Sequence, residues 1–474
     1  MFNKPLRNHP TYILEKIGAS FLVLALLAGN MLTANTQNMA DLFSLHYWKM
    51  IFSQVLSGNF SVLLGSAGIM IFLFVVICVS ALRWSRTFFH IEDELLFSER
   101  RTMLKKTSKL PVNSITTVNI SQNLFEKIVG TAKVKIDINS AATADKSDFV
   151  FILKLSTAQQ FKDALLSAQN KKEVQQDLPH TMLASFSTAD ALRHQLLSIP
   201  LVQIATAIAV FLPMFVGETA VLKDALTALA VSAVMYAGSL VFGVLNLADF
   251  RLETDGKRIF ISHGKLRTQN YAFEKTRVKA VFLKQSLLAR LFGFCSVELA
   301  VVGLGNEKNE SPRLCLLVKK DRAQRLIDEL LPAYTSKKKA IVSEKAALIP
   351  AFLLTALATA VVFAFTWGFP PYGYILSGAV LVLGIVSGAL SQKTRTISLE
   401  ENLICCSSGI LNKKTGRFLY RDIQEARLHT NVLMQKGNFG RIGFSILSAK
   451  NVSMQKTGWF KAEIYDELSR KILK

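Results

Sequence analysis

The sequence predicts an integral membrane protein in which six helical spans, paired as three hairpins, alternate with three small cytoplasmic β-rich domains, each ending in a helix. Three observations support this fold class. Six apolar stretches each approach the ~20 residues needed to cross a hydrocarbon core. Lys and Arg residues gather at the same side of these stretches. Similar segments recur between them, which indicates an internal repeat.

Composition agrees with a membrane location. The 474 residues have room for about three domains of ordinary size, and 50% of them are hydrophobic. Against 34 Asp and Glu stand 56 Lys and Arg, which gives a formal net charge of +22. Such an excess favours an anionic surface nearby. Because the apolar stretches already place the chain in a bilayer, we expect anionic inner-leaflet lipids as partners and no nucleic acid.

The apolar stretches come in pairs, and short polar or Pro-Gly links join the second and third pairs. The stretches cover about residues 17–34, 60–82, 199–216, 222–246, 346–366 and 372–390. Links this short predict helical hairpins. The first stretch can also be interpreted as a cleaved signal peptide, because Lys4, Arg7 and Lys16 precede it. The second stretch would still leave the following polar segment in the cytoplasm.

The positions of Lys and Arg predict the orientation. Basic residues flank the outer ends of every pair, whereas the interior links carry only Lys49 and Lys223. Since positively charged residues stay on the cytoplasmic side, we expect a multi-pass protein of the cell (inner, cytoplasmic) membrane. Both termini and all three long polar segments would then face the cytoplasm.

A repeated segment marks each polar region. Gln122 and Gly130 have the same spacing as Gln285 and Gly293, and a looser third copy places Gly440 in the glycine position. We interpret these residues as structural. Each copy ends in an amphipathic helix, and the runs before it, broken by turn residues, predict six or seven short strands that form a small sandwich or barrel.

These segments resemble the bacterial membrane-anchored pleckstrin-homology-like (PH-like) domains of the second type, in their three-copy, YdbT-like form. The resemblance covers nearly the whole chain and rests on the strand–glycine–strand openings at Gly264 and Gly409, the glutamine-to-glycine segments and the terminal helices. It implies PH-like β-sandwiches with a C-terminal helix, carried on paired spans. The first copy departs from the pattern, with Glu99 and Arg100 in place of the opening glycine.

The apolar stretches, the repeat and the resemblance together predict seven parts of the chain. Transmembrane hairpins occupy residues 1–86, 199–247 and 336–392, PH-like domains occupy 87–170, 248–335 and 393–474, and a linker covers 171–198. For the function, the resemblance implies an envelope role, such as a response to stress or resistance to antimicrobial agents. It supplies no catalytic residues.

The sequence carries none of the usual catalytic constellations. It has no Walker-type loop, no GxSxG elbow, no HExxH helix and no CxxC pair, and its seven histidines are scattered. We therefore expect no enzyme, no catalytic residue, no metal and no cofactor. The five cysteines, among them the adjacent Cys405 and Cys406, are expected to be reduced and buried.

Basic residues near the opening strand of each copy are the candidate contacts with lipid or with a partner. They are Lys105, Lys106, Lys109, Lys265, Arg267, Lys413, Lys414 and Arg417. They would let the domains act as a non-enzymatic scaffold that binds anionic headgroups or another membrane protein. Alternatively, they only follow the positive-inside rule. A transporter or lipid-handling protein is the competing function, and Gly384 and Gly388 leave homo-oligomerisation through the spans open.

Overall fold

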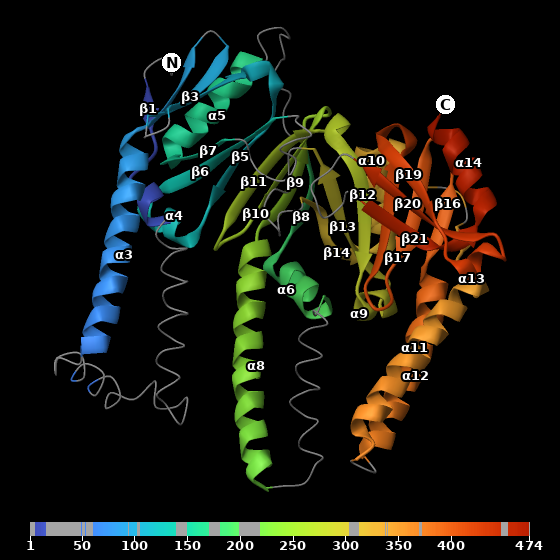
Figure 1. Cartoon of the computed structure of the whole chain (residues 1–474). Helices are drawn as coiled ribbons and strands as arrows, with labels where there is room; N and C mark the ends of the chain where they lie inside the picture. Colours follow the sequence, from blue (N-terminus) through green and yellow to red (C-terminus); the bar gives the residue numbers. More distant parts are fainter. Residues whose placement is uncertain are drawn as a thin grey trace. The chain divides into compact units, whose positions relative to one another are not determined.

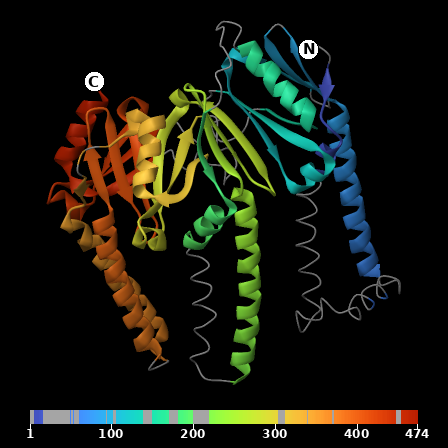
Figure 2. The same ribbon diagram turned by 180° about the vertical axis from the view of Figure 1, so that it is seen from behind.

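The structure, a computed structural model, is shown in Figure 1 and from behind in Figure 2. It describes residues 5–15, 49, 53, 60–92, 94–101, 105–138, 149–169, 181–198, 219–302, 312–336, 338, 340–368, 372–446 and 454–473. The chain forms two compact units. The first consists of Met1–Ile115, Gln122–Val134 and Val150–Gln175, and the second of Thr116–Ser121, Lys135–Phe149 and Gln176–Lys474.

One order of elements occurs three times. A short strand precedes an apolar helical region, which is followed by three strands, a 3-10 turn, three more strands with a short helix among them, and a terminal helix. In the first copy these are β1 (Leu6–Arg7), α3 (Phe60–Ser85), β2 (Thr87–Glu92), β3 (Leu95–Arg101), β4 (Lys105–Pro111), β5 (Ile115–Gln122), α4 (Leu124–Val129), β6 (Thr131–Ile138), β7 (Phe149–Lys154) and α5 (Leu155–Gln169).

The second copy begins before its apolar helix. Its elements are β8 (Thr181–Phe186), α6 (Thr188–Leu197), α8 (Thr219–Leu247), β9 (Phe250–Thr254), β10 (Arg258–His263), β11 (Thr268–Glu274), β12 (Val278–Gln285), α9 (Leu287–Leu291), β13 (Phe294–Val301), β14 (Arg313–Lys319) and α10 (Lys320–Leu330). The predicted linker, 171–198, therefore contains a strand and a helix. β8 pairs with β9, and Ala184 and Phe186 are buried in the core of this copy, so these residues belong to it.

The third copy has the same order. Its elements are β15 (Ile341–Val342), α11 (Leu348–Thr366), α12 (Tyr372–Thr394), β16 (Thr396–Leu399), β17 (Leu403–Ser408), β18 (Lys413–Leu419), β19 (Ile423–His429), α13 (Val432–Gln435), β20 (Phe439–Ile446), β21 (Met454–Lys461) and α14 (Ala462–Ile472). Each copy thus contributes seven strands to the described part of the chain, in agreement with the predicted six or seven.

Two helices in the described residues are long and apolar enough to cross a membrane, Lys345–Thr366 and Gly373–Thr394. The structure does not support the predicted number of six spans. The predicted stretches 17–34 and 199–216 lie outside the described residues. The stretches 60–82 and 222–246 are helical, within α3 and α8, but the apolar parts that qualify there, Phe74–Ser85 and Ser232–Leu247, are shorter than a span.

The helices α11 and α12 pack as a close hairpin through the glycines noted in the sequence. A Cβ added to Gly384 would lie 2.2 Å from Thr355 Cγ2, and one added to Gly388 would lie 3.2 Å from the Cβ of Ala351. Both glycines are needed for contact within the hairpin, which is the role of small residues between membrane helices. Homo-oligomerisation through the spans stays a prediction.

Sheets in the second unit continue from one copy into the next. One sheet has the order β14-β13-β12-β18-β17-β16-β15, so that β12 of the second copy pairs with β18 of the third. The pairing is antiparallel and runs from Ala280 opposite Phe418 to Gln285 opposite Lys413. β5, of which Thr116–Ser121 belongs to the second unit, neighbours β11 in the same way. We call the β12–β18 contact the copy junction.

The copy junction joins two hydrophobic cores. Phe282 from β12 packs with Phe418 at a ring-centroid distance of 5.6 Å and belongs to the core of the third copy. Val281 and Leu283, which point to the other face of the same strand, belong to the core of the second copy. Each face of β12 therefore completes a different core.

Candidate functional site at the membrane-proximal rim

A short helix occupies the same place in each copy, and its ends explain why it forms there. In α9, Ser286 Oγ accepts a hydrogen bond from Ala289 N–H at 3.1 Å, and Gly293 follows the helix with φ of +70°. In the first copy, Gly130 has φ of +74° after α4. Residues at such positions sit in the left-handed region, where glycine adopts the backbone angles without a steric penalty.

The third copy uses Asn438 at this position, not Gly440. Asn438 has φ of +56°, whereas Gly440 lies within β20. The Asn438 carbonyl accepts a hydrogen bond from the N–H of the first residue of the terminal helix α14. The Gly130 and Gly293 carbonyls accept the same bond from the first residues of α5 and α10. Gly440 is therefore not the equivalent of Gly130 and Gly293, because asparagine also tolerates the left-handed region and occupies that position two residues earlier. Gly440 is still structural, since a Cβ there would lie 2.4 Å from Leu428 Cδ1.

Gln122 and Gln285 have the structural role that the repeat predicted. Gln122 Nε2 donates to the Thr131 carbonyl at 2.6 Å, and Gln285 Nε2 donates to the Phe294 carbonyl at 3.0 Å. In the third copy Thr430 Oγ1 donates to the equivalent Phe439 carbonyl at 2.8 Å. In all three copies this hydrogen bond joins the strand before the short helix to the strand after it.

The short helices expose apolar side chains at one end of their domains. The exposed fractions are 78% for Ile128 on α4, 74% for Leu291 and 63% for Phe292 at α9, and 77% for Val432 on α13. Figure 1 shows α9 at the end of its domain from which α8 extends, and α10 at the opposite end. Within the first unit, α4 likewise lies on the side toward which α3 extends, away from α5. Recurring exposed apolar patches of this kind mark interaction surfaces.

Predicted contacts Lys265 and Arg267 lie in the β10–β11 turn, directly beside the end of α8. Gly264 N–H donates to the Ala248 carbonyl at 2.8 Å, and Lys265 N–H donates to the Leu245 carbonyl at 2.7 Å. Gly264 has φ of +103°, and a Cβ there would lie 1.9 Å from the Arg267 carbonyl oxygen, so the turn requires glycine. The exposed Lys265 Nζ lies 3.7 Å from Asp249 Oδ2.

The same relation holds in the first copy. Arg101 N–H donates to the Arg86 carbonyl at 2.8 Å, immediately after the end of α3. Predicted contacts Lys105, Lys106 and Lys109 are exposed on β4, the next strand after β3. The early hairpin of this copy forms without the opening glycine, with Glu99 opposite Thr107. Within each copy taken by itself, we call the short helix, together with the basic residues that follow the third strand in the first two copies, the membrane-proximal rim, because an apolar helix extends from the same end of the domain.

Three segments of the chain, residues 51–169, 199–334 and 346–459, match the bacterial PH domain. The chain belongs to the bacterial PH domain family. It is similar to the UPF0699 transmembrane protein YdbT of Bacillus subtilis (strain 168), with 19% identity over 415 residues that cover 80% of this chain and 83% of YdbT. No solved structure matches the chain. The protein is therefore a membrane-associated protein with three bacterial PH domains.

In the third bacterial PH domain, the predicted contacts lie at the copy junction and not on a free surface. Burial lowers the pKa of Lys413 and of Lys414, with further lowering by nearby basic groups, and Lys414 Nζ lies 3.8 Å from the Phe282 ring centroid. Arg417 is buried and donates to the Tyr334 carbonyl at 3.0 Å and to Gln324 Oε1 at 2.6 Å. Arg417 is thus a structural residue, because its guanidinium has no access to a headgroup.

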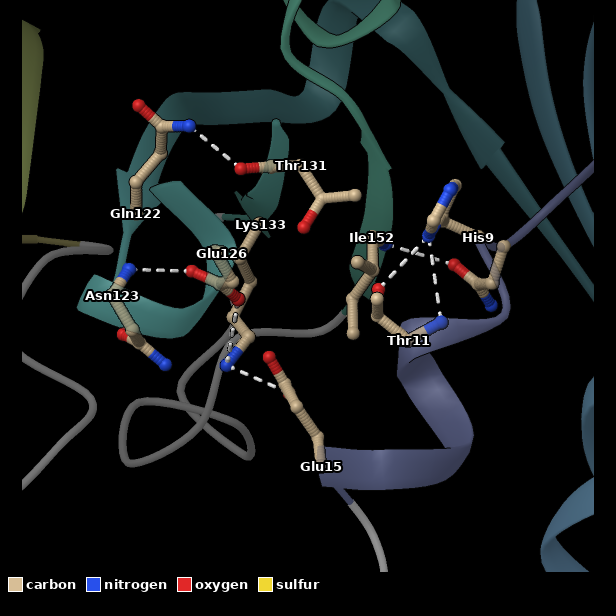
Figure 3. A network of polar contacts seen from close by, with 10 residues as sticks. His9, Thr11, Glu15, Gln122, Asn123, Glu126, Thr131, Lys133 and Ile152 are labelled. Carbon is tan, nitrogen blue, oxygen red and sulfur yellow. Dashed lines mark hydrogen bonds and ion pairs between the residues drawn. The ribbon is translucent and has the colours of Figure 1, made fainter. Parts of the chain in front are cut away.

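The sequence did not predict a buried polar network beneath α4 of the first bacterial PH domain (Figure 3). Lys133 Nζ lies 2.9 Å from Glu15 Oε2 and 3.8 Å from Glu126 Oε1. Burial, a hydrogen bond to Glu15 and the charge of Glu15 raise the Glu126 pKa to about 7, although the Asn123 N–H and Lys133 oppose the shift. The Asn-x-x-Glu capping box was the available signal, because its glutamate is fixed at the start of a helix.

Proposed function

We propose that this protein is a non-enzymatic membrane scaffold whose bacterial PH domains rest on the anionic cytoplasmic leaflet. The observation that carries the proposal is the membrane-proximal rim. There, exposed apolar residues such as Leu291 lie at the same end of the domain as the basic β10–β11 turn, which is hydrogen-bonded to the end of α8. Apolar side chains suit the acyl boundary of a leaflet, and lysine and arginine suit its phosphates.

The energies fit positioning of the domains better than anchoring. Burial of a large apolar side chain contributes roughly 1.5–3 kcal/mol, and each basic residue near an anionic surface contributes about 1 kcal/mol. One short helix and one basic turn therefore give a few kcal/mol per domain. The apolar helices already hold the chain in the membrane, so this sum serves to fix the orientation of each domain.

Contact of α3 and α8 with lipid, and a cytoplasmic location of both termini, are also part of the proposal. Its support in the described residues is that α3 and α8 expose large apolar side chains, with exposed fractions of 67% for Phe74, 73% for Val234 and 71% for Met235. Surfaces of this kind are expected to face lipid. Domains held on one leaflet would meet a membrane partner at roughly millimolar effective concentration.

The test uses the full chain reconstituted in vesicles, with Cys78→Ser to remove the partly exposed thiol. Burial raises the pKa of Cys295 to about 11 and that of Cys315 to about 12, so the native buried thiols should not compete. A Leu291→Cys reporter is then labelled with a membrane-impermeant maleimide. We expect labelling to be several-fold slower in vesicles that contain phosphatidylglycerol than in phosphatidylcholine alone.

Lys265→Gln with Arg267→Gln should restore fast labelling in the anionic vesicles, as should high salt, because both weaken attraction to the headgroups. Arg325→Gln, exposed on α10 at the opposite end of the same domain, serves as the control and should leave the rate unchanged. Equal labelling rates in the two lipids would contradict headgroup recognition. Protection that appears only when cell extract is added would indicate a partner protein in place of lipid.

A further inference from the structure

Among the edge strands in the described part of the chain, β4 and β19 are of the kind that pairs between copies elsewhere, and each lacks that pairing. The sheet β1-β2-β3-β4 ends at β4, and the sheet β19-β20-β21 begins at β19. Their counterparts in the other copies are paired, since β18 corresponds to β4 and β12 corresponds to β19. The chain thus leaves open one strand of each kind that forms the copy junction.

The sequence of β4 closely follows that of the strand that already pairs. β4 is Lys-Lys-Thr-Ser-Lys-Leu-Pro and β18 is Lys-Lys-Thr-Gly-Arg-Phe-Leu, so Lys105, Lys106 and Thr107 match Lys413, Lys414 and Thr415. Both strands hold the same register to the preceding strand, with Leu110 opposite Leu96 and Phe418 opposite Ile404. The β4 edge is therefore built like one that a neighbouring copy covers elsewhere in the chain.

β19 offers the same edge as β12. Both strands follow a three-residue 3-10 turn, Tyr420–Asp422 before β19 and Lys275–Arg277 before β12. Both begin with an irregularity at the same place, between Ile423 and Glu425 in β19 and between Val278 and Ala280 in β12. Since register is what decides which side chains meet across a pair of strands, these two edges can accept the same kind of strand.

We infer that β19 of one molecule pairs with β4 of a second copy of this chain, so that the sheet of the copy junction continues from molecule to molecule. Transfer of the β12–β18 register places Arg427 opposite Ser108 and Thr430 opposite Lys105. The contact is head-to-tail, because it joins two different surfaces, and it generates a ring or a filament in the plane of the membrane. Backbone hydrogen bonds between edge strands supply the attraction.

The intermolecular contact is more polar than the copy junction. Where Ala280 and Phe282 are buried at the junction, β19 carries the exposed Glu425 and Arg427. Charged edge strands keep isolated molecules from aggregating in solution. Pairing therefore needs the high local concentration that confinement to a membrane gives, and it weakens as the chains are diluted with lipid.

Four single cysteines test the register in membranes that hold two differently tagged full-length chains, each with Cys78→Ser. One chain carries Ser108→Cys or Lys105→Cys, and the other carries Arg427→Cys or Thr430→Cys. A short bismaleimide should join the two tags for Ser108 with Arg427 and for Lys105 with Thr430. The crossed combinations should give at least about tenfold less product, because they are displaced ~10 Å along the strands.

Lys284→Cys with Lys414→Cys in one chain is the positive control, since these residues already lie opposite each other at the copy junction. The inference is overturned if this control reacts and the matched pairs do not join the two tags. It is also overturned if the crossed pairs react equally well, or if the matched pairs react only within one chain or only with another protein. Lys105 and Ser108 lie on β4, Arg427 lies on β19 and Thr430 directly follows β19, and none of these four residues is buried.

Discussion

Arg417 and Lys109 occupy the same position in two copies of one strand, and their neighbours give them different roles. Arg417 is covered by β12 of the preceding copy and bonds to Tyr334 and Gln324. Lys109 is exposed, with its Nζ 5.3 Å from the Phe97 ring centroid. The sequence predicted both residues as surface contacts, because nothing in the local sequence indicates that another copy covers Arg417.

Substitution of these two residues should separate the roles. Arg417→Gln removes buried charge-assisted hydrogen bonds and leaves the Tyr334 carbonyl without this donor, so we expect a loss of about 2–3 kcal/mol in the local free energy of unfolding of β18. Lys109→Gln should change that of β4 by less than about 0.5 kcal/mol. Native-state hydrogen exchange of the two strands gives both values. Equal losses would contradict burial of Arg417.

Glu126 predicts a pH dependence in the first bacterial PH domain. Its pKa is raised from 4.5 to about 7 in the folded state, so its contribution to stability is complete below pH 4.5 and is lost as the pH rises through about 7. Hydrogen exchange of α4 should therefore report a local stability that falls by roughly 2 kcal/mol between pH 5 and 8. Glu126→Gln, which mimics the protonated acid, should abolish most of this fall.

The matched control for Glu126 is Glu329→Gln on the exposed side of α10, which should leave the pH dependence of α4 as it is in the natural protein. The groups that face Glu126 are the Glu15 carboxylate, the Lys133 ammonium and the Asn123 N–H. If the natural protein and Glu126→Gln show the same pH slope, the raised pKa is wrong.

Among the elements, the short helix after the fifth strand of each copy depends on one left-handed residue. Gly293 has open space where a Cβ would lie, so only its backbone angle opposes a larger residue. Gly293→Ala should therefore cost about 1 kcal/mol in the stability of α9, whereas Asn438→Gly should be neutral or slightly stabilising. Hydrogen exchange of α9 and α13 measures both effects. A larger loss at Asn438 than at Gly293 would contradict the equivalence of the two positions.

Many elements were predictable from the sequence because they depend on local pattern. Periodicity predicted α10 and α14, and the shared spacing of Gln122 and Gln285 predicted a structural segment that the hydrogen bonds confirm. Gly440 was placed in the glycine position from sequence spacing alone. The three copies share a left-handed backbone conformation at that position and not a glycine, and Asn438 adopts it in the third copy. The strand β8 was assigned to a linker because it is short and its pairing partner, β9, lies far along the chain. Its local sequence therefore does not indicate which sheet it joins.

At the scale of the whole molecule, pairing between copies could not be predicted. The residues of β12 look like those of any buried strand, and only the three-dimensional arrangement shows that its two faces serve two cores. Hydropathy alone also did not determine the number of membrane-spanning helices. Hydropathy indicated six apolar stretches, whereas two helices in the described residues meet the length and apolarity of a span.

The proposed orientation places the two ends of the third copy's apolar hairpin on opposite sides of the membrane. Trp367, at the end of α11, should lie outside the cell, and Glu329 on α10 should lie in the cytoplasm. In intact cells, an impermeant maleimide should label Trp367→Cys at once and Glu329→Cys only after the membrane is made permeable. Labelling of Glu329→Cys in intact cells would reverse the proposed topology.

Depth-dependent quenching measures whether the membrane-proximal rim enters the leaflet. An environment-sensitive fluorophore is attached at Leu291→Cys or at Glu329→Cys in the reconstituted full chain, and lipids with a nitroxide near the headgroup act as quenchers. We expect strong quenching and a blue-shifted emission at Leu291, with neither effect at Glu329, at the opposite end of the domain. Equal, weak quenching at both positions would show that the rim does not enter the leaflet.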